Sequence, residues 1–165
     1  MRDDICMREE EVREFLRQNS NAILVSNGRR GFPHAVAMCY ELDEDGSLRF
    51  HTYGRSQKVR NIERDPRVTL LVESGSAYDE LRGVMLEGTA EISKDLDATV
   101  ATMLATLAEL AEGSGETPPD VAGMPEAVKQ QMAGKRVLVR VRPRRVVSWD
   151  HGKLPKGKAF AGLPG

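Results

Sequence analysis

The chain has 165 residues, of which 30% are charged, and a formal net charge of −1. This length predicts one domain with a sizeable core, and the balanced charge with few aromatic residues excludes the basic, stacking surface of a nucleic-acid-binding protein. Two cysteines, the absence of an apolar run of the ~18 residues that a membrane helix needs, and the lack of an apolar signal core predict a cytoplasmic protein that does not enter a membrane.

The first third of the chain predicts one helix followed by three strands. Residues 7–18 carry apolar side chains at helical spacing, which indicates an amphipathic helix that covers the core. Residues 21–26 form a continuous apolar run, and residues 33–42 and 47–52 form two further strands separated from it by glycine-containing turns. Two hairpins in succession predict an antiparallel meander.

The segment after the third strand predicts a turn and a short helix. Gly54 ends the strand, Ser56 is a good N-cap, and Asp65 before a proline ends the helix after about two turns. Arg55 and Lys58 flank the helix N-terminus, where cations are mildly disfavoured unless an anion binds. Free amides, a serine hydroxyl and two cations therefore predict a site for a phosphate monoester. The alternative is that these basic residues form the solvated side of a surface helix.

The rest of the chain predicts a barrel with additional helices. Strands are expected over residues 68–73, 83–92 and 135–141, and helices over residues 95–112 and 124–132. Gly88 within the fifth strand is expected to mark a bend or a close backbone approach. Six antiparallel strands with a short helix between the third and fourth are typical of a small closed barrel.

The segment from Phe50 to Leu70 resembles the signature of the pyridoxamine 5'-phosphate oxidase-like superfamily, the FMN-binding split barrels. The matching residues are Phe50, His51, Thr52, Ser56, Lys58, Ile62, Asp65, Pro66, Val68 and Leu70. The resemblance implies a mainly β fold with flanking helices, an antiparallel six-stranded split β-barrel. It also implies a homodimer that binds FMN, or in one branch the deazaflavin coenzyme F420, between its subunits.

The resemblance implies roles for particular residues. Ser56 and Lys58 would hold the cofactor phosphate with Arg55, and His51 and Thr52 would lie along the cofactor. Trp149 is either a packing residue or, as C-terminal segments do in this superfamily, crosses to the partner's cofactor. Arg82 is a weak candidate for a substrate contact, against the alternative of an exposed arginine at a strand end. The expected cofactor-binding set is His51, Thr52, Arg55, Ser56, Gln57, Lys58 and Trp149.

Two departures from the signature bear on the substrate. The pyridoxamine phosphate oxidases themselves have an arginine where this chain has Gln57, and they carry an arginine and a lysine on the strand that here is residues 35–41. Vitamin B6 is therefore not expected as the substrate. Residues 78–84 and 148–151 are instead similar to small FMN- or deazaflavin-dependent oxidoreductases, which implies hydride transfer between the cofactor and a small organic molecule.

The sequence also bears on metal sites, catalytic side chains and alternative functions. The three histidines are scattered and predict no metal site, and no catalytic side chain is expected because a flavin ring itself carries the hydride. A non-catalytic flavin, deazaflavin or haem carrier and a structural dimer with a vacant groove remain alternatives. F420 would need extra basic surface for its acidic tail, from Arg29 and Arg30 or from Lys153, Lys156 and Lys158. We expect one domain over residues 1–152 and a flexible tail over residues 153–165.

Overall fold

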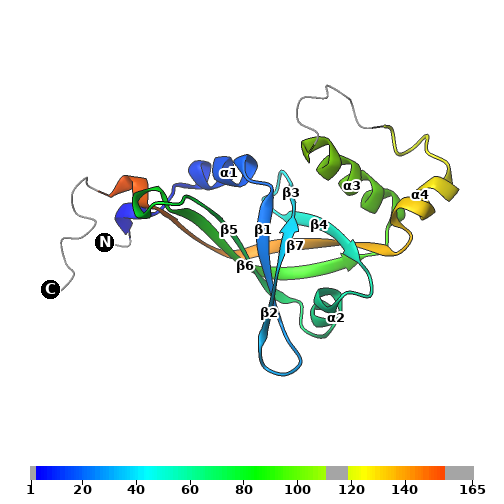
Figure 1. Cartoon of the computed structure of the whole chain (residues 1–165), viewed down its shortest axis with the longest axis horizontal. Coiled ribbons are helices and arrows are strands. Elements are labelled where there is room, and N and C mark those ends of the chain that lie inside the picture. Colours follow the sequence, from blue (N-terminus) through cyan, green and yellow to red (C-terminus); the bar gives the residue numbers. More distant parts are fainter. Residues whose placement is uncertain (1–2, 111–118, 155–165) are drawn as a thin grey trace.

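The computed structural model describes residues 3–110 and 119–154 (Figure 1). These residues form a seven-stranded antiparallel sheet flanked by four α-helices and three short 3-10 helices. The strands are β1 (Asn21–Asn27), β2 (Pro33–Cys39), β3 (Glu41–Leu42), β4 (Leu48–Tyr53), β5 (Arg67–Ser74), β6 (Arg82–Ser93) and β7 (Arg136–Asp150). The helices are α1 (Glu9–Gln18), α2 (Gln57–Arg64), α3 (Leu96–Leu110), α4 (Glu126–Ala133), η1 (Asp3–Ile5), η2 (Tyr78–Glu80) and η3 (His151–Lys153).

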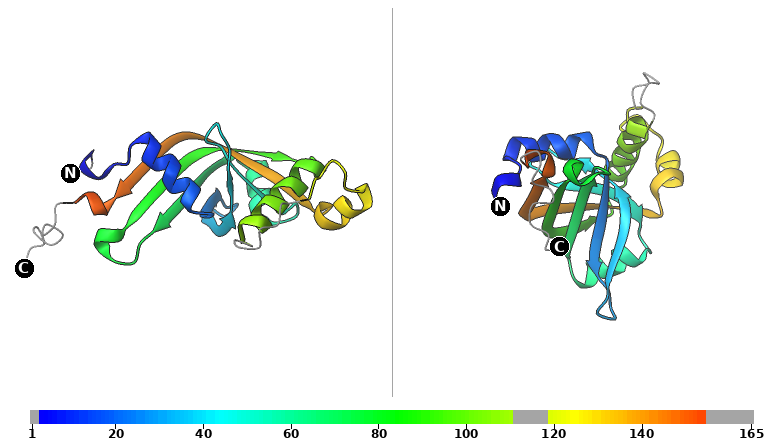
Figure 2. Two further views of the ribbon diagram at one scale, coloured as in Figure 1. Left: turned by 90° about the horizontal axis from the view of Figure 1, so that it is seen from above. Right: turned by 60° about the vertical axis from the view of Figure 1, so that its left-hand side comes forward.

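The strand order makes the sheet curl into a split barrel. The order is β2-β1-β5-β6-β7-β4-β3, so that β2 and β3 occupy the two edges although only Tyr40 separates them in the chain. One residue cannot span an open sheet of seven strands, and the sheet must therefore curve until its edges approach each other (Figure 2). Tyr40 is buried at this junction, and its hydroxyl donates to the carbonyl oxygen of Leu16 at 2.7 Å.

The core lies inside this curved sheet. Alternate residues of each strand face inward, as the register of Leu24 with Leu70 and of Leu70 with Leu86 shows. All three leucines are at most 2% exposed, and burial of each such side chain contributes about 1.5–3 kcal/mol. Phe15 and Leu16 of α1 complete the core, which confirms the predicted role of the N-terminal helix.

Helix α2 is anchored to the barrel by both apolar and polar side chains. Val59 and Ile62 enter the core, and Asn61, which is fully buried, donates from Nδ2 to Oγ of Ser26 on β1 at 3.1 Å. Gln57 donates from Nε2 to Oδ1 of Asn61 at 2.8 Å. The first turn of α2 therefore has a fixed position relative to the strands.

Helices α3 and α4 pack together beyond the start of β7 (Figure 1). Lys129 of α4 is buried, and its Nζ lies 2.7 Å from Oδ1 of Asp97 on α3. Helix α3 also contacts β3, β4 and β7, with Thr106 donating to a carboxylate oxygen of Glu41 at 3.1 Å. This placement brings α3 over the end of β4 that leads to α2.

The structure corrects several sequence-based boundaries. There are seven strands in the described residues rather than six, because the predicted strand over residues 33–42 is interrupted at Tyr40. The last strand does not end at Val141 but continues to Asp150, since its outer half pairs with β6. The bend expected at Gly88 is confirmed: a register shift lies between Glu87 and Gly88.

Lys153, the first residue of the predicted C-terminal tail, lies in η3. Its Nζ is 2.7 Å from Oε2 of Glu11, so η3 contacts α1. The flexibility of the tail stays a prediction. The predictions for residues 111–118 and 155–165 lie outside the described residues. Within the described ranges, none of the helices combines the length and the apolar character needed to cross a membrane.

Candidate functional site

The N-terminus of α2 presents several unpartnered polar groups. Ser56 is the N-cap and its amide donates to the carbonyl oxygen of Tyr53 at 3.0 Å, but its side chain makes no capping hydrogen bond. The Ser56 Oγ atom is buried and has no hydrogen-bond partner. The next three amides, of residues 57–59, have no intrahelical acceptor in an α-helix. A buried hydroxyl and three amides without acceptors fit an anion such as a phosphate.

Lys58 supplies a cation beside this helix end. Its Nζ donates to Oγ1 of Thr52 on β4 at 3.0 Å, so the side chain points toward the barrel rather than into solvent. Partial burial lowers the pKa of Lys58 from its ordinary value, because the ammonium loses hydration without gaining a carboxylate partner. A bound phosphate would restore that balance.

A cavity of about 370 Å³ opens between β2, β4 and α3, where the barrel is split. We call it the split cavity. Its wall is mostly apolar, but His51 and Thr52 of β4 contribute polar groups. The lining residues are Ala37, Met38, Cys39, His51, Thr52, Met103, Thr106, Leu107 and Arg136.

Arg136, the first residue of β7, contacts both His51 and Tyr53 of β4. Its Nη1 atom is 3.2 Å from Nδ1 of His51, and its Nη2 atom donates to the hydroxyl of Tyr53 at 3.4 Å. The guanidinium also lies over the Tyr53 ring, with Cζ 4.4 Å from the ring centroid. Burial and the Arg136 charge both lower the pKa of His51, which keeps the imidazole neutral.

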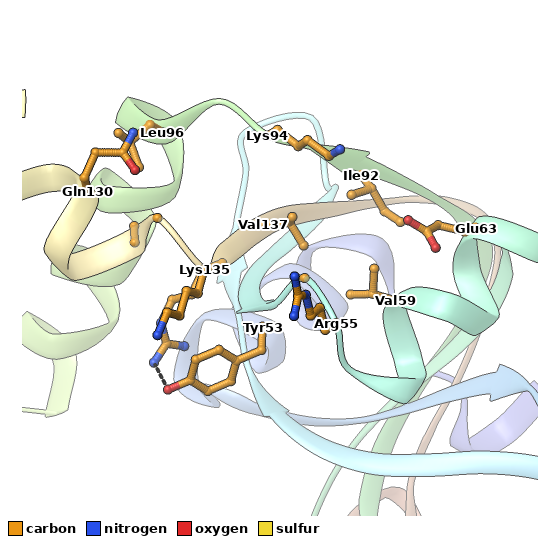
Figure 3. A pocket seen from close by; sticks show the side chains of 14 residues that line it. Tyr53, Arg55, Val59, Glu63, Ile92, Lys94, Leu96, Gln130, Lys135 and Val137 are labelled. Atoms are coloured by element: carbon orange, nitrogen blue, oxygen red, sulfur yellow. Dashed lines mark hydrogen bonds between the residues drawn. The ribbon is translucent and has the colours of Figure 1, made fainter.

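A second, larger groove of about 640 Å³ shares Arg136 with the split cavity and lies between α2, α4, the end of β6 and the start of β7. Figure 3 shows its lining side chains. We call it the basic groove, because four of its lining residues are cationic and only Glu63 is acidic. The cations are Arg55, Lys94, Lys135 and Arg136. None of the four is in an ion pair with another described residue.

The structure brings most of the predicted cofactor residues together. His51 and Thr52 line the split cavity, Lys58 contacts Thr52, and Arg55 lines the basic groove. Gln57 is next to Ser56, but its side-chain amide is engaged with Asn61. The expected strand–turn–helix over these residues is confirmed, whereas their role in binding stays a prediction.

Trp149 and Arg82 lie elsewhere in the chain. Trp149 is near the end of β7, thirteen residues from Arg136, which corresponds to about 40 Å along an extended strand. It sits beside Gly83 of β6, and its ring occupies the space that a Cβ atom on Gly83 would need. Arg82 faces Asp150, with Nε 3.1 Å from Oδ2, and lies over the ring of Phe15. Within one chain, neither residue reaches the site at α2.

Sequence reasoning missed Arg136 and the contribution of α3. Arg136 was one of several arginines in a basic segment, and only its pairing opposite Tyr53 in the β4–β7 register places it at the site. The apolar spacing of α3 predicts only a packing surface, yet Met103 and Leu107 line the split cavity. No local pattern in these segments indicates which strand they will contact.

Comparison with known proteins identifies the family. The model of the family described as pyridoxamine 5'-phosphate oxidase matches residues 9–150. The chain belongs to the pyridoxamine 5'-phosphate oxidase family.

Three known proteins illustrate what this chain is similar to. A 5a,11a-dehydrotetracycline/5a,11a-dehydrooxytetracycline reductase of Streptomyces rimosus is 28% identical over 149 residues, which cover 87% of this chain and 84% of the reductase. A conserved hypothetical protein of Mycobacterium tuberculosis has a similar structure (TM-score 0.79, 36% identity, 100% and 97% of the two chains). A structure described as an F420 reductase is also similar (TM-score 0.53, 26% identity, 76% and 87%). These matches support an oxidoreductase of this family.

Proposed function

We propose that this protein is an oxidoreductase that binds FMN or F420 and transfers a hydride between that cofactor and a small organic substrate. The observation that carries the proposal is the buried, unpartnered Ser56 hydroxyl at the N-terminus of α2, with the uncompensated cation of Lys58 beside it. Both cofactors contain a phosphate, and this helix end fits one.

Each residue of the site has a role in this proposal. The Ser56 hydroxyl and the first amides of α2 donate to the phosphate, and Lys58 and Arg55 neutralise its charge. The ring of the cofactor, when bound, supplies the two-electron chemistry of hydride transfer. His51 and Thr52 orient the ligands from β4, while Met38, Met103 and Leu107 exclude water from the split cavity.

A specific observation favours F420 as the alternative to FMN. The F420 molecule extends beyond its phosphate in an acidic tail, and the basic groove begins at Arg55, next to Ser56. Of the cations expected to meet such a tail, Arg29 and Arg30 are exposed in the β1–β2 turn, and Lys153 is instead paired with Glu11. The groove around Lys94 and Lys135 is the better candidate for this role.

The activity for which the Streptomyces relative is named suggests a substrate class. That relative is named as a reductase of dehydrotetracyclines, which are fused-ring molecules that carry conjugated oxygen atoms. The split cavity of this protein combines apolar walls with a few polar groups. We therefore propose a conjugated, ring-containing organic molecule as the substrate class.

We also propose that a second copy of the chain completes the site. A row of apolar residues crosses the outer face of five neighbouring strands, in the register Ala37, Ile23, Leu71, Met85 and Val147. Ile23 is 37% exposed although it is isoleucine in the middle of a sheet. The row begins at the split cavity, where Ala37 is part of the lining, and ends beside Trp149. A partner on this face would bring its own Trp149 toward the cavity, which is the second of the two roles considered for Trp149 from the family resemblance.

Absorption spectroscopy of the purified protein tests the proposal directly. Titration with FMN, F420 and haem, each followed by removal of free ligand, should leave a flavin or deazaflavin band at one molecule per chain. Reduction of bound FMN by NADPH, or oxidation of reduced F420 by a dehydrotetracycline, would then separate an enzyme from a carrier. Retention of haem alone, or of none of the three, would contradict the proposal. Light scattering with and without cofactor tests the dimer.

A further inference from the structure

The contact between Arg136 and His51 determines where the imidazole proton lies. A guanidinium group has only donors, so Nδ1 of His51, 3.2 Å from Arg136 Nη1, must accept the hydrogen bond. A neutral imidazole that accepts at Nδ1 carries its hydrogen on Nε2. His51 is therefore fixed as the Nε2–H tautomer.

Arg136 is held in place for this contact by Tyr53. Tyr53 is directly opposite Arg136 in the β4–β7 register, and its ring and hydroxyl both contact the guanidinium. Farther along β7, Arg140, Arg142 and Arg145 each lie within 3.2 Å of a carboxylate oxygen. Arg136 instead meets an uncharged ring nitrogen and a phenol, and its charge is not compensated by any carboxylate of the described residues.

His151 provides the opposite arrangement within the same protein. Its Nδ1 atom lies 2.8 Å from the carbonyl oxygen of Tyr78, which can only accept a hydrogen bond. His151 must therefore carry hydrogen on Nδ1. His51 is therefore expected to carry its hydrogen on Nε2 because it accepts from Arg136, and His151 on Nδ1 because it donates to the Tyr78 carbonyl oxygen.

The polar groups that line the split cavity are predominantly donors. With Nδ1 engaged, the remaining polar atom of His51 is the Nε2–H group, for which no described residue supplies an acceptor. The Thr52 oxygen already accepts from Lys58, which leaves its hydroxyl hydrogen free to donate. The charged and titratable groups around His51 are Arg136 from β7, Lys58 from α2 through Thr52, and Cys39 from β2. Among the described side chains of α3, those that line the cavity are Met103, Thr106 and Leu107, none of which is titratable.

We propose that Arg136 and His51 form an oxygen-recognition pair in the split cavity. Arg136 is the positioning residue, and the Nε2–H group of His51 donates to an electron-rich oxygen of an apolar ring ligand, such as a phenolate, an enolate or a conjugated carbonyl. The neutral imidazole donates this hydrogen bond without giving up its proton. The assignment rests on the proposed function in one respect, namely that the ligand of the split cavity is the substrate.

Nitrogen NMR of the cofactor-free protein tests the tautomer. With ¹⁵N-labelled histidine, His51 should show a protonated Nε2 and an unprotonated Nδ1 at pH 7, and His151 the reverse. Arg136→Met should mix the His51 tautomers and raise the pKa of His51, whereas Arg136→Lys should preserve the pattern. Arg140→Gln, on the same strand, should leave the His51 signals unchanged. A proton on Nδ1 of His51, or an unchanged pattern in Arg136→Met, would overturn the assignment.

Binding of p-nitrophenol tests the ligand chemistry by absorbance. The cavity should bind its phenolate form and lower the apparent pKa of the bound phenol. His51→Phe should weaken binding about tenfold or more, as expected for loss of a hydrogen bond to a charged oxygen, and His51→Gln should restore part of it. Equal affinity in His51→Phe, or no saturable binding, would overturn the proposal. Neither experiment needs FMN or F420, so failure of cofactor binding alone would count only against the proposed function.

Discussion

The Nζ atom of Lys58 lies 3.0 Å from Oγ1 of Thr52, which connects the first turn of α2 directly to β4. Thr52 is 4% exposed, so a lysine that sequence reasoning would also allow on a solvated helix face instead reaches the barrel wall. This contact places the cation between the helix N-terminus and the split cavity. Substitutions near this contact can therefore be used to distinguish an effect on cofactor binding from an effect on the stability of the fold.

Charge reversal at Lys58 should abolish cofactor retention. Lys58→Glu replaces an attractive contact with repulsion at the proposed phosphate site, and we expect the dissociation constant for FMN or F420 to rise at least 100-fold. Equilibrium dialysis measures the loss, and circular dichroism verifies the fold. Arg60→Glu is the matched control, because Arg60 is exposed on the same helix. Unchanged retention in Lys58→Glu would refute the phosphate role.

Removal of the Ser56 hydroxyl should weaken cofactor binding without lowering the stability of the cofactor-free protein. The side chain makes no capping hydrogen bond, so Ser56→Ala should not show the loss of about 1 kcal/mol that is usual for an N-cap. Loss of one hydrogen bond to a phosphate should reduce affinity about tenfold or more. Calorimetric titration and urea unfolding measure the two effects. A large loss of stability with unchanged affinity would show that the hydroxyl is structural.

Replacement of Asn61 should destabilise the barrel. Asn61→Leu leaves the buried Ser26 hydroxyl without the donor that it has at 3.1 Å and removes the acceptor of Gln57, which we expect to cost about 1–3 kcal/mol. The free energy of unfolding in urea gives the value. The double variant with Ser26→Ala should recover part of the loss. Simple additivity of the two substitutions would mean that the hydrogen bond contributes little.

A methyl group on Gly83 should displace Trp149. The added Cβ would lie 2.1 Å from Cζ2 of the indole, so the ring must move or the β6–β7 pair must open. Trp149 is the single tryptophan of the chain, and its fluorescence therefore reports Gly83→Ala directly. Gly123→Ala, where the new atom would be 3.9 Å from its nearest neighbour, is the control. An unchanged emission spectrum in Gly83→Ala would contradict the placement of the indole.

Acid should loosen the contact between α1 and η3. Hydrogen bonds from Lys153 and from the Arg8 amide lower the pKa of Glu11 from 4.5 to about 2. A depressed carboxylate pKa gives stabilisation that is complete above the unfolded value and is lost as pH falls from about 4.5 toward 2. Hydrogen-exchange protection factors in α1, which are corrected for the intrinsic exchange rate at each pH, should fall over that range, and Lys153→Gln should remove this part of the pH dependence. Protection factors in α1 that do not change with pH would contradict the contact.

Much of the fold could be predicted from local sequence. The β4–α2 segment was predicted closely, because Gly54, Ser56 and Asp65 each have strong conformational preferences that agree with the tertiary structure. The close approach at Gly88 also follows from the residue type, since a Cβ atom there would lie 2.4 Å from the Arg142 carbonyl oxygen. At these positions the conformational preference of the residue and the tertiary packing favour the same structure.

The rest required long-range information. The outer half of β7 contains consecutive arginines and a proline, which weaken a strand prediction, and its pairing with β6 overrides this local preference. The contact of Arg136 with His51 joins residues 85 positions apart. The sequence around Ser56 could predict a phosphate site, but only the barrel register shows which cations and which cavity lie beside it.

The position of β4 in the sheet has a consequence for biosynthesis. Its long neighbour is β7, so the strand that carries His51 and Thr52 remains without that neighbour until residues 136–141 have left the ribosome. Helix α2 is synthesised much earlier than β7, so most of the chain must be made before Arg136 can pair opposite Tyr53 of β4. A nascent or prematurely terminated polypeptide would thus expose an open strand edge, and the proposed cofactor site would be complete only after β7 has been synthesised.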